Sequence, residues 1–177
     1  MRFLSRDEAA ELAQQITSNL TVQSDPYAVM KGSPGLQVIF EDVGGGRFYW
    51  LAQQLASSLE YFDWCLLWVT QTEVWASSQN LHLYYALRSS YGEQSEIDQR
   101  PGQRFLRHEL ADLVSFIHIG MLNGWDMLLC TSHDYGRVFV SHDGWAEVVR
   151  PNGATLESLE KVFAEADLKI RTLRPAS

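Results

Sequence analysis

The chain contains 177 residues with a formal net charge of −8 at pH 7, and 46% of its residues are hydrophobic. This length predicts one domain built around one core, and no apolar run approaches the roughly 18 residues of a membrane-spanning helix. We therefore expect no membrane partner. The negative charge repels phosphate backbones, so we expect no nucleic-acid partner either.

The negative charge is concentrated in the first part of the chain. Residues 1–99 contain 5 Lys and Arg against 12 Asp and Glu, whereas residues 100–177 contain 9 against 10. The two parts therefore carry charges of −7 and −1. Such an asymmetry can attract a basic protein partner, although ordinary solubility also explains it.

The N-terminal residues and the cysteines bear on the cellular compartment. The segment MRFLSRDEAAEL carries charges where a signal peptide has its apolar stretch. Cys65 and Cys130 each lie in an apolar, strand-like run without an adjacent His or Arg, which is typical of buried, unreactive thiols in a reducing compartment. A disulfide between them is the less favoured alternative. We expect a cytoplasmic protein.

The first part of the chain predicts a helix, a strand and a second helix. Ser5 and Glu8 form a predicted capping box for a helix to about Leu20. Residues 36–40 predict a strand, and apolar spacing predicts a helix over residues 48–60. The glycines at 44–46, between this strand and this helix, match no dinucleotide or P-loop spacing and follow two acidic residues, so a phosphate site is rejected.

The stretch from Tyr61 to Gly92 is the predicted centre of the fold. Cys65 to Thr70 is apolar at both odd and even positions, which predicts a strand covered on both faces with Trp68 in the core. Thr72 to Trp75 is expected to prolong this strand or to pair beside it. Residues 81–88 then predict a helix, with N-cap oxygens before it.

The second part of the chain predicts consecutive strands between two helices. Phe105 is expected to open a short edge strand, and a helix is expected over 109–122. Three strands are predicted over 127–130, 137–141 and 145–149, before a last helix near 156–166. We expect residues 1–4 and 169–177 to be frayed tails. The fold class is α+β: one domain over 1–177, with a mixed or mainly antiparallel sheet flanked by helices.

The tripeptide Ser-His-Asp occurs at 132–134 and again at 141–143. Histidine and aspartate are the materials of general base catalysis, so the catalytic candidates are His133, Asp134, His142 and Asp143. A strand between the two histidines would place them about 20–25 Å apart, which argues against one joint site. The alternative is that both tripeptides supply turn residues on either side of that strand.

Metal and cofactor signatures are missing from the sequence. No paired-cysteine, His-Glu-x-x-His, acidic calcium-loop or nucleophile-elbow spacing is present. We expect no metal and no cofactor, and an enzyme is the less favoured class of function.

Aromatic and acidic side chains suggest a protein-binding surface instead. Tyrosine and tryptophan beside carboxylates suit recognition of a protein, although most of the tryptophans are expected in the core. A core position for Tyr84 or Tyr85 is the open alternative. The binding candidates are Glu41, Asp42, Glu73, Trp75, Tyr84, Tyr85 and Trp145.

Three segments between Leu66 and Trp145 carry a resemblance: LLWVTQTEVWASSQNLHLYYALRSSYG, HELADLVSFIHIGMLNGWD and RVFVSHDGW. They resemble small bacterial cytosolic proteins of uncharacterised activity, and the size and acidity of the chain are similar to those of immunity partners of bacterial toxins. The resemblance implies a bacterial source and a single α/β domain. It implies no catalytic or binding residue.

Three classes of function follow. The leading one is a protein-binding module, such as an immunity-type inhibitor, that covers a basic partner with an acidic, aromatic face from residues 1–99. The second is a small hydrolase-like enzyme that uses His133 or His142 with a neighbouring aspartate. The third is a homo-oligomeric structural protein whose exposed aromatic side chains meet across a twofold axis. A convex acidic patch would support the first, a concave pocket around a histidine the second, and a flat apolar patch the third.

Overall fold

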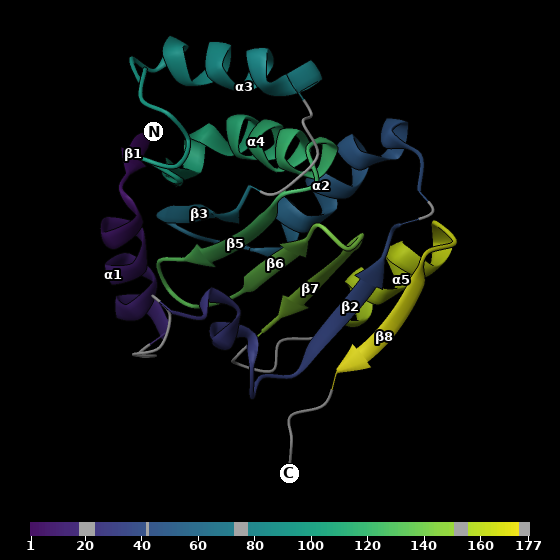
Figure 1. The fold of residues 1–177 in the computed structure, drawn as a ribbon. Coiled ribbons are helices and arrows are strands. Elements are labelled where there is room, and N and C mark those ends of the chain that lie inside the picture. Colours follow the sequence, from purple (N-terminus) through teal and green to yellow (C-terminus); the bar gives the residue numbers. More distant parts are fainter. Residues whose placement is uncertain (18–23, 42, 73–77, 151–155, 174–177) are drawn as a thin grey trace.

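The computed structural model describes residues 1–17, 24–41, 43–72, 78–150 and 156–173 (Figure 1). These residues form five α-helices, which are α1 (Arg6–Thr17), α2 (Phe48–Ser58), α3 (Ser78–Ser90), α4 (Leu110–Leu122) and α5 (Glu157–Glu165). Three short 3-10 helices are η1 (Pro26–Met30), η2 (Gly45–Arg47) and η3 (Arg107–Glu109). The strands are β1 (Arg2–Leu4), β2 (Gly35–Ile39), β3 (Trp64–Gln71), β4 (Gly102–Leu106), β5 (Asp126–Thr131), β6 (Arg137–Ser141), β7 (Trp145–Val149) and β8 (Lys169–Leu173).

All eight strands belong to one sheet in the order β1-β4-β3-β5-β6-β7-β2-β8. Every neighbouring pair is antiparallel. The middle of the sheet is a meander from β5 to β7, because short polar turns connect these strands. The fold is α+β, as the order of the predicted elements indicated.

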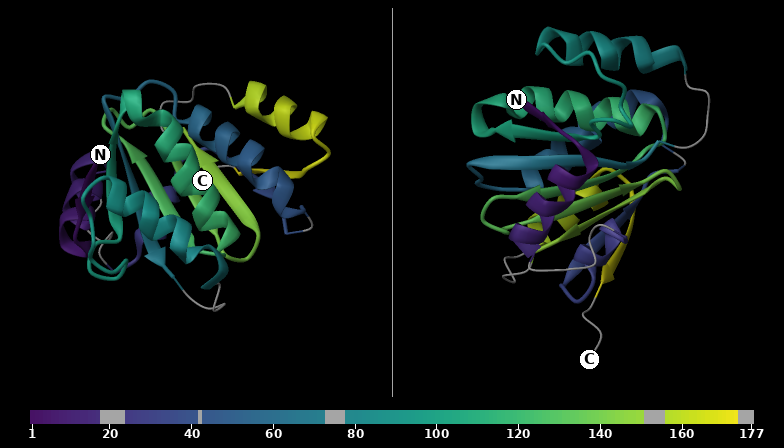
Figure 2. Two further views of the ribbon diagram at one scale, coloured as in Figure 1. Left: turned by 90° about the horizontal axis from the view of Figure 1, so that it is seen from above. Right: turned by 60° about the vertical axis from the view of Figure 1, so that its left-hand side comes forward.

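Helices cover the two faces of the sheet unequally. Helices α2, α4 and α5 pack on one face, and α3 lies outside α4 as a further layer (Figures 1 and 2). Helix α1 and η1 cover the other face. Helix α1 packs closely on β4 because small residues meet there. A Cβ added at Gly102 of β4 would lie only 2.9 Å from the Cβ of Ala9 in α1.

Strand β3 confirms the expectation of a strand buried on both faces. Leu67 belongs to the core beneath α2 and α4, whereas Trp68 belongs to the core beneath α1 and is 0% exposed. Cys65 and Cys130 are free thiols in these two different cores, so the sheet separates them. Burial raises the pKa of both thiols, that of Cys130 to about 12.

The expected frayed ends are wrong for residues 2–4 and 169–173. Residues 2–4 pair with β4, because Phe3 and Leu4 enter the cores on opposite faces of the sheet. Residues 169–173 pair with β2 as the other edge strand, and their polar side chains are largely exposed. Since β1 covers β4, the strand at Phe105 is not an edge. Residues 174–177 lie outside the described residues.

The predicted bounds of α2, α4 and α5 agree with the structure to within two residues. Helix α3 is longer at both ends than the predicted 81–88, and the predicted end of the first helix near residue 20 lies outside the described residues. Ser5 and Glu8 form the expected capping box, with the Ser5 amide donating to Glu8 Oε2 at 2.8 Å and the Glu8 amide donating to Ser5 Oγ at 3.2 Å. Strand β3 ends at Gln71, and residues 73–75, which were expected to prolong or flank it, lie outside the described residues.

No helix in the described part of the chain is long and apolar enough to cross a membrane.

Candidate functional site

Strand β6 separates the two Ser-His-Asp tripeptides, as expected. Arg137, at the start of β6, pairs with Cys130, and Val140, near its end, pairs with Met127. His133 therefore lies at the end of the sheet where β3 begins, and His142 lies at the end where β2 and β6 finish. The two histidines occupy separate sites.

The partner of His142 is Asp126, the first residue of β5. Asp126 Oδ1 accepts a hydrogen bond from the backbone N–H of His142 at 2.7 Å and lies 2.9 Å from its Nδ1. The adjacent Asp143 lies on the other side of the ring, with its Oδ1 3.4 Å from Nε2. Carboxylates therefore face both ring nitrogens, and the contacts of Asp126 fix the orientation of the ring.

Sequence reasoning missed Asp126, although a signal for it was present. The strands predicted over 127–130 and 137–141 pair in the structure with Met127 opposite Val140, so one more step along the ladder places Asp126 opposite Ser141 and beside His142. The sequence motif instead named Asp143, the carboxylate next to His142 in the chain. The closer partner comes from the neighbouring strand.

His142 lines a hollow of about 310 Å³, here called the His142 hollow. Its apolar side consists of four side chains, from the residue after β2, from α2, from α4 and from the residue before β5: Phe40, Phe48, Met121 and Trp125. Its polar side contains Glu41, His142 and Asp143. Glu41 and Asp143 are exposed, and Glu41 has no ion-pair partner among the described residues. The site is therefore concave, partly apolar and acidic.

The turn after β6 brings Glu41 to this hollow. Gly144 has φ +77°, and a Cβ added there would lie 2.6 Å from the Cβ of Glu41. The Phe40 amide donates to the Gly144 carbonyl at 2.7 Å. Only glycine fits both this backbone conformation and this close approach. The binding candidate Glu41 and the catalytic candidates His142 and Asp143 thus meet in one place.

The second tripeptide has different surroundings. His133 Nε2 lies 2.8 Å from Asp63 Oδ2, and both side chains are exposed. Asp134 does not pair with His133. It accepts two hydrogen bonds from the Arg137 guanidinium, at 2.7 and 2.6 Å, across a tight turn. Neither His133 nor Asp134 is part of the His142 hollow.

The predicted binding aromatics do not form one face. Tyr84 is 1% exposed, so its assignment to a surface patch is wrong, and its hydroxyl accepts hydrogen bonds from Arg88 at 2.9 Å and Gln103 at 3.1 Å. Burial raises the pKa of Tyr84 to about 12. Tyr85 is half-buried on α3. Trp145 packs on the sheet face covered by η1, away from the His142 hollow. Asp42, Glu73 and Trp75 lie outside the described residues.

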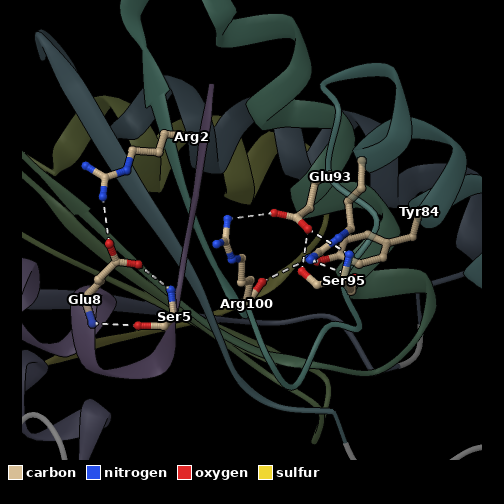
Figure 3. Close-up of polar contacts among 8 residues, drawn as sticks. Arg2, Ser5, Glu8, Tyr84, Glu93, Ser95 and Arg100 are labelled. Carbon is tan, nitrogen blue, oxygen red and sulfur yellow. Dashed lines mark hydrogen bonds and ion pairs between the residues drawn. The ribbon is translucent and has the colours of Figure 1, made fainter.

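A second hollow, of about 290 Å³, lies near β1 and is lined mainly by polar groups. Its two arginines are paired within it: Arg2 donates to Glu8 at 2.7 Å, and Arg100 donates to Glu93 at 3.2 Å (Figure 3). The Met1 ammonium group pairs with Glu109. Burial raises the pKa of Glu93, but hydrogen bonds from Ser95 and the charge of Arg100 outweigh it, so this pKa is lowered. Because these charges cancel, this hollow has less to offer a charged ligand than the His142 hollow.

Within the described residues, no three His, Cys, Asp or Glu side chains are arranged to hold a metal ion. Comparison of the chain with known protein families, curated proteins and solved structures gives no match.

Proposed function

We propose that this chain is a protein-binding module and that the His142 hollow receives a basic side chain of its partner. One observation carries the proposal: Asp126 and Asp143 lie on either side of the His142 ring, and Glu41 lines the same hollow beside its apolar wall. Three carboxylates outnumber one imidazole, so the hollow keeps a negative charge whether the ring carries one proton or two. A lysine or arginine head would offset that charge.

The shape of the hollow suits a long basic side chain. Lysine and arginine bury their methylene stems against apolar surface while the charged head remains near water or a counter-charge. Phe48 and Met121 offer apolar contact for the stem, and Glu41 and Asp143 lie at the exposed rim for the head. Because water screens charges at an exposed rim, the ion pair itself contributes only about 0–1 kcal/mol, and burial of the stem supplies the rest of the affinity.

Charge neutralisation tests this proposal directly. In a double variant, Glu41→Gln with Asp143→Asn, we expect a lysine- or arginine-bearing peptide to bind more weakly than to the wild type. The matched control is Glu96→Gln with Asp98→Asn, which removes the same charge from exposed positions elsewhere. The His142 ring signals are followed by NMR while a basic or an acidic peptide is added. The basic peptide should bind the control variant like the wild type and the Glu41 and Asp143 variant more weakly.

The partner itself can be sought in the native host by affinity capture. Rising salt should slow association by roughly tenfold or more and change dissociation less, since exposed charges act by steering. The variant at Glu41 and Asp143 should reproduce the effect of salt. Identical binding by this variant, the control and the wild type at low salt, with no change as salt rises, would remove the proposal.

An enzyme is the second candidate, and a specific contact favours it. Asp126 beside Nδ1 is the arrangement that orients a catalytic histidine and leaves Nε2 directed at a substrate. Asp143 opposite Nε2 counts against it, because that carboxylate occupies the direction a substrate would need. Turnover of a panel of ester and amide substrates, lost in both His142→Ala and Asp126→Asn, would establish the enzyme in place of the binding module.

A further inference from the structure

We infer that His142 supplies a positive charge to its own hollow and that a basic side chain of the partner replaces this charge, so that binding releases a proton from the ring. This inference rests on the function proposed above and concerns the regulation of the same site. It makes the His142 hollow sensitive to pH. A basic partner binds more weakly in acid, where an imidazole ring is charged, and more tightly at neutral pH.

Asp126 fixes one proton on the ring, at Nδ1. Its Oδ1 lies 2.9 Å from Nδ1 and also accepts the backbone N–H of His142 at 2.7 Å. An ionised carboxylate can only accept hydrogen bonds, so Nδ1 carries a proton whether the ring is neutral or charged. The Asp126 side chain is 12% exposed, which keeps this contact away from most of the solvent. Exchange of a proton with the solvent therefore takes place at Nε2.

Nε2 faces a second acceptor, the Asp143 carboxylate, at 3.4 Å. In the neutral ring Nε2 has a lone pair and no proton, so two acceptors oppose each other. The contact becomes favourable when the ring takes up a second proton, or when another molecule places a hydrogen-bond donor beside both acceptors. The Asp143 side chain is 68% exposed, which gives it room to turn toward such a donor. Lysine and arginine heads carry only donors.

The basic groups of the neighbouring elements are directed elsewhere. Arg47, immediately before α2, donates to the Ala166 carbonyl at 2.6 Å. The ring of His118 in α4 packs on α2, and Lys169 begins β8. None of these three basic residues lines the hollow. Among the described residues that line it, His142 is therefore the only basic one, and the other charged ones are carboxylates.

A bound basic head and a charged ring disfavour each other, because two cations then lie side by side at Glu41 and Asp143. The neutral ring is favoured instead, since its Nε2 accepts a hydrogen bond from the head. The proton that leaves Nε2 passes to a base in solution, and no covalent bond of the ligand changes. A unit charge about 4 Å away in water changes binding roughly fivefold, so the neutral ring should bind a basic head roughly three- to fivefold more tightly.

The NMR signals of the His142 ring test the inference in the wild-type chain. The probe is a peptide with blocked termini that contains one arginine and no other titratable side chain, so its own charge does not change with pH. Added in excess, it should lower the pH at which the ring titrates by roughly half a pH unit, because ligand and proton weaken each other's binding by the same factor. At neutral pH, the nitrogen chemical shifts of the bound ring should show a proton on Nδ1 and none on Nε2.

The affinity for the same peptide gives a second readout. It is measured between about pH 5.5 and 8, where imidazole changes its charge and ordinary carboxylates stay ionised. The wild type should bind roughly three- to fivefold more weakly at the acid end. His142→Gln cannot ionise and should bind equally at both ends. The matched control is His133→Gln, in the other Ser-His-Asp tripeptide, which should keep the pH dependence of the wild type.

The possible results distinguish this inference from the function on which it rests. Equal binding by the wild type at both ends of the pH range, without a change in the ring titration, overturns the inference and still supports a site for a basic side chain. A pH dependence that persists in His142→Gln also overturns it, because another group then exchanges the proton. A peptide that binds at no pH overturns both the inference and the proposed function.

Discussion

The two Ser-His-Asp tripeptides have the same sequence and opposite surroundings. At His142 the paired carboxylate is Asp126, whose side chain is 12% exposed and which bonds both the ring and the backbone N–H. At His133 the paired carboxylate is Asp63, whose side chain is 60% exposed. Buried charge pairs interact more strongly than exposed ones, because water screens the exposed pair. The same three residues therefore make a fixed site at one end of the sheet and a weak surface pair at the other.

The register of the sheet, and not the tripeptide, selects each histidine's partner. Cys65 pairs with Thr131, so two more steps along the β3–β5 ladder place Asp63 opposite His133. On the other side of the molecule, the β5–β6 ladder places Asp126 beside His142. In both cases the aspartate next in sequence is not the closest partner: Asp134 serves the turn, and Asp143 lies farther from the ring than Asp126 does.

The largest effect is expected from Trp68→Ala, which tests whether the two ends of the sheet depend on one core. Trp68 is fully buried on β3, between the two ends. Truncating a buried aromatic side chain costs about 3–5 kcal/mol of unfolding free energy, and Trp68→Phe should cost less. Denaturant unfolding measures the loss, and hydrogen exchange should show faster opening at both ends of the sheet. Faster exchange at one end alone would contradict a shared core.

The next largest effect is the difference in stability loss between substitutions of Asp126 and Asp63. Asp126→Ala should destabilise the protein by roughly 1.5–3 kcal/mol, since a nearly buried acceptor of charge-assisted hydrogen bonds is lost. Asp63→Ala should cost about 0–1 kcal/mol, as for exposed ion pairs. Denaturant unfolding of both variants, with Asp126→Asn as the conservative control, gives the difference. Equal losses would show that exposure does not distinguish the two sites.

Local patterns in the sequence predicted most of the fold. The bounds of β6 and β7 were predicted correctly, because turn residues flank alternating or wholly apolar runs on both sides. The edge strands β1 and β8 were missed, since a three-residue strand and a polar strand carry little apolar signal. Such segments form strands because they pair with β4 and β2, and the local sequence pattern does not specify this pairing.

The candidate site was predicted in part. His142, Asp143 and Glu41 were named from the sequence, but their meeting depends on how the turn at Gly144 packs on the end of β2. Tyr84 was assigned to the surface because a tyrosine at a helical position is compatible with either environment. Its burial depends on Arg88, one turn further along α3, and on Gln103 of β4, which supply its hydrogen bonds. Contacts of this kind come from tertiary packing.

A third carboxylate, Glu147, is buried without a histidine partner and so separates the effect of burial from that of a histidine. Glu147 lies in the middle of β7, is 4% exposed, and accepts a hydrogen bond from the Tyr27 hydroxyl at 2.6 Å. Burial raises its pKa above the ordinary value of 4.5 although the hydrogen bond from Tyr27 opposes this. Burial without a cation therefore disfavours the charged form, whereas Asp126 has an imidazole beside it.

The smallest effect is expected from Glu147→Gln. The raised pKa of Glu147 predicts that the stability difference between this variant and the wild type depends on pH. Because the folded protein holds the Glu147 proton more tightly than the unfolded chain, the contribution of protonated Glu147 to stability is complete below pH 4.5 and is lost as pH rises through the raised pKa. Glutamine cannot ionise and still accepts the Tyr27 proton. Thermal melts should therefore give similar melting temperatures for variant and wild type in acid, and a higher one for the variant at neutral pH.

Tyr27→Phe is the control for this experiment. It removes the hydrogen bond that lowers the pKa of Glu147, so the loss of stability should move to higher pH. A wild type that gains stability relative to Glu147→Gln as pH rises would show that the buried carboxylate is favoured in its charged form. In that case exposure alone would not explain why Asp126 and Asp63 differ, and the charge of each partner would have to be included.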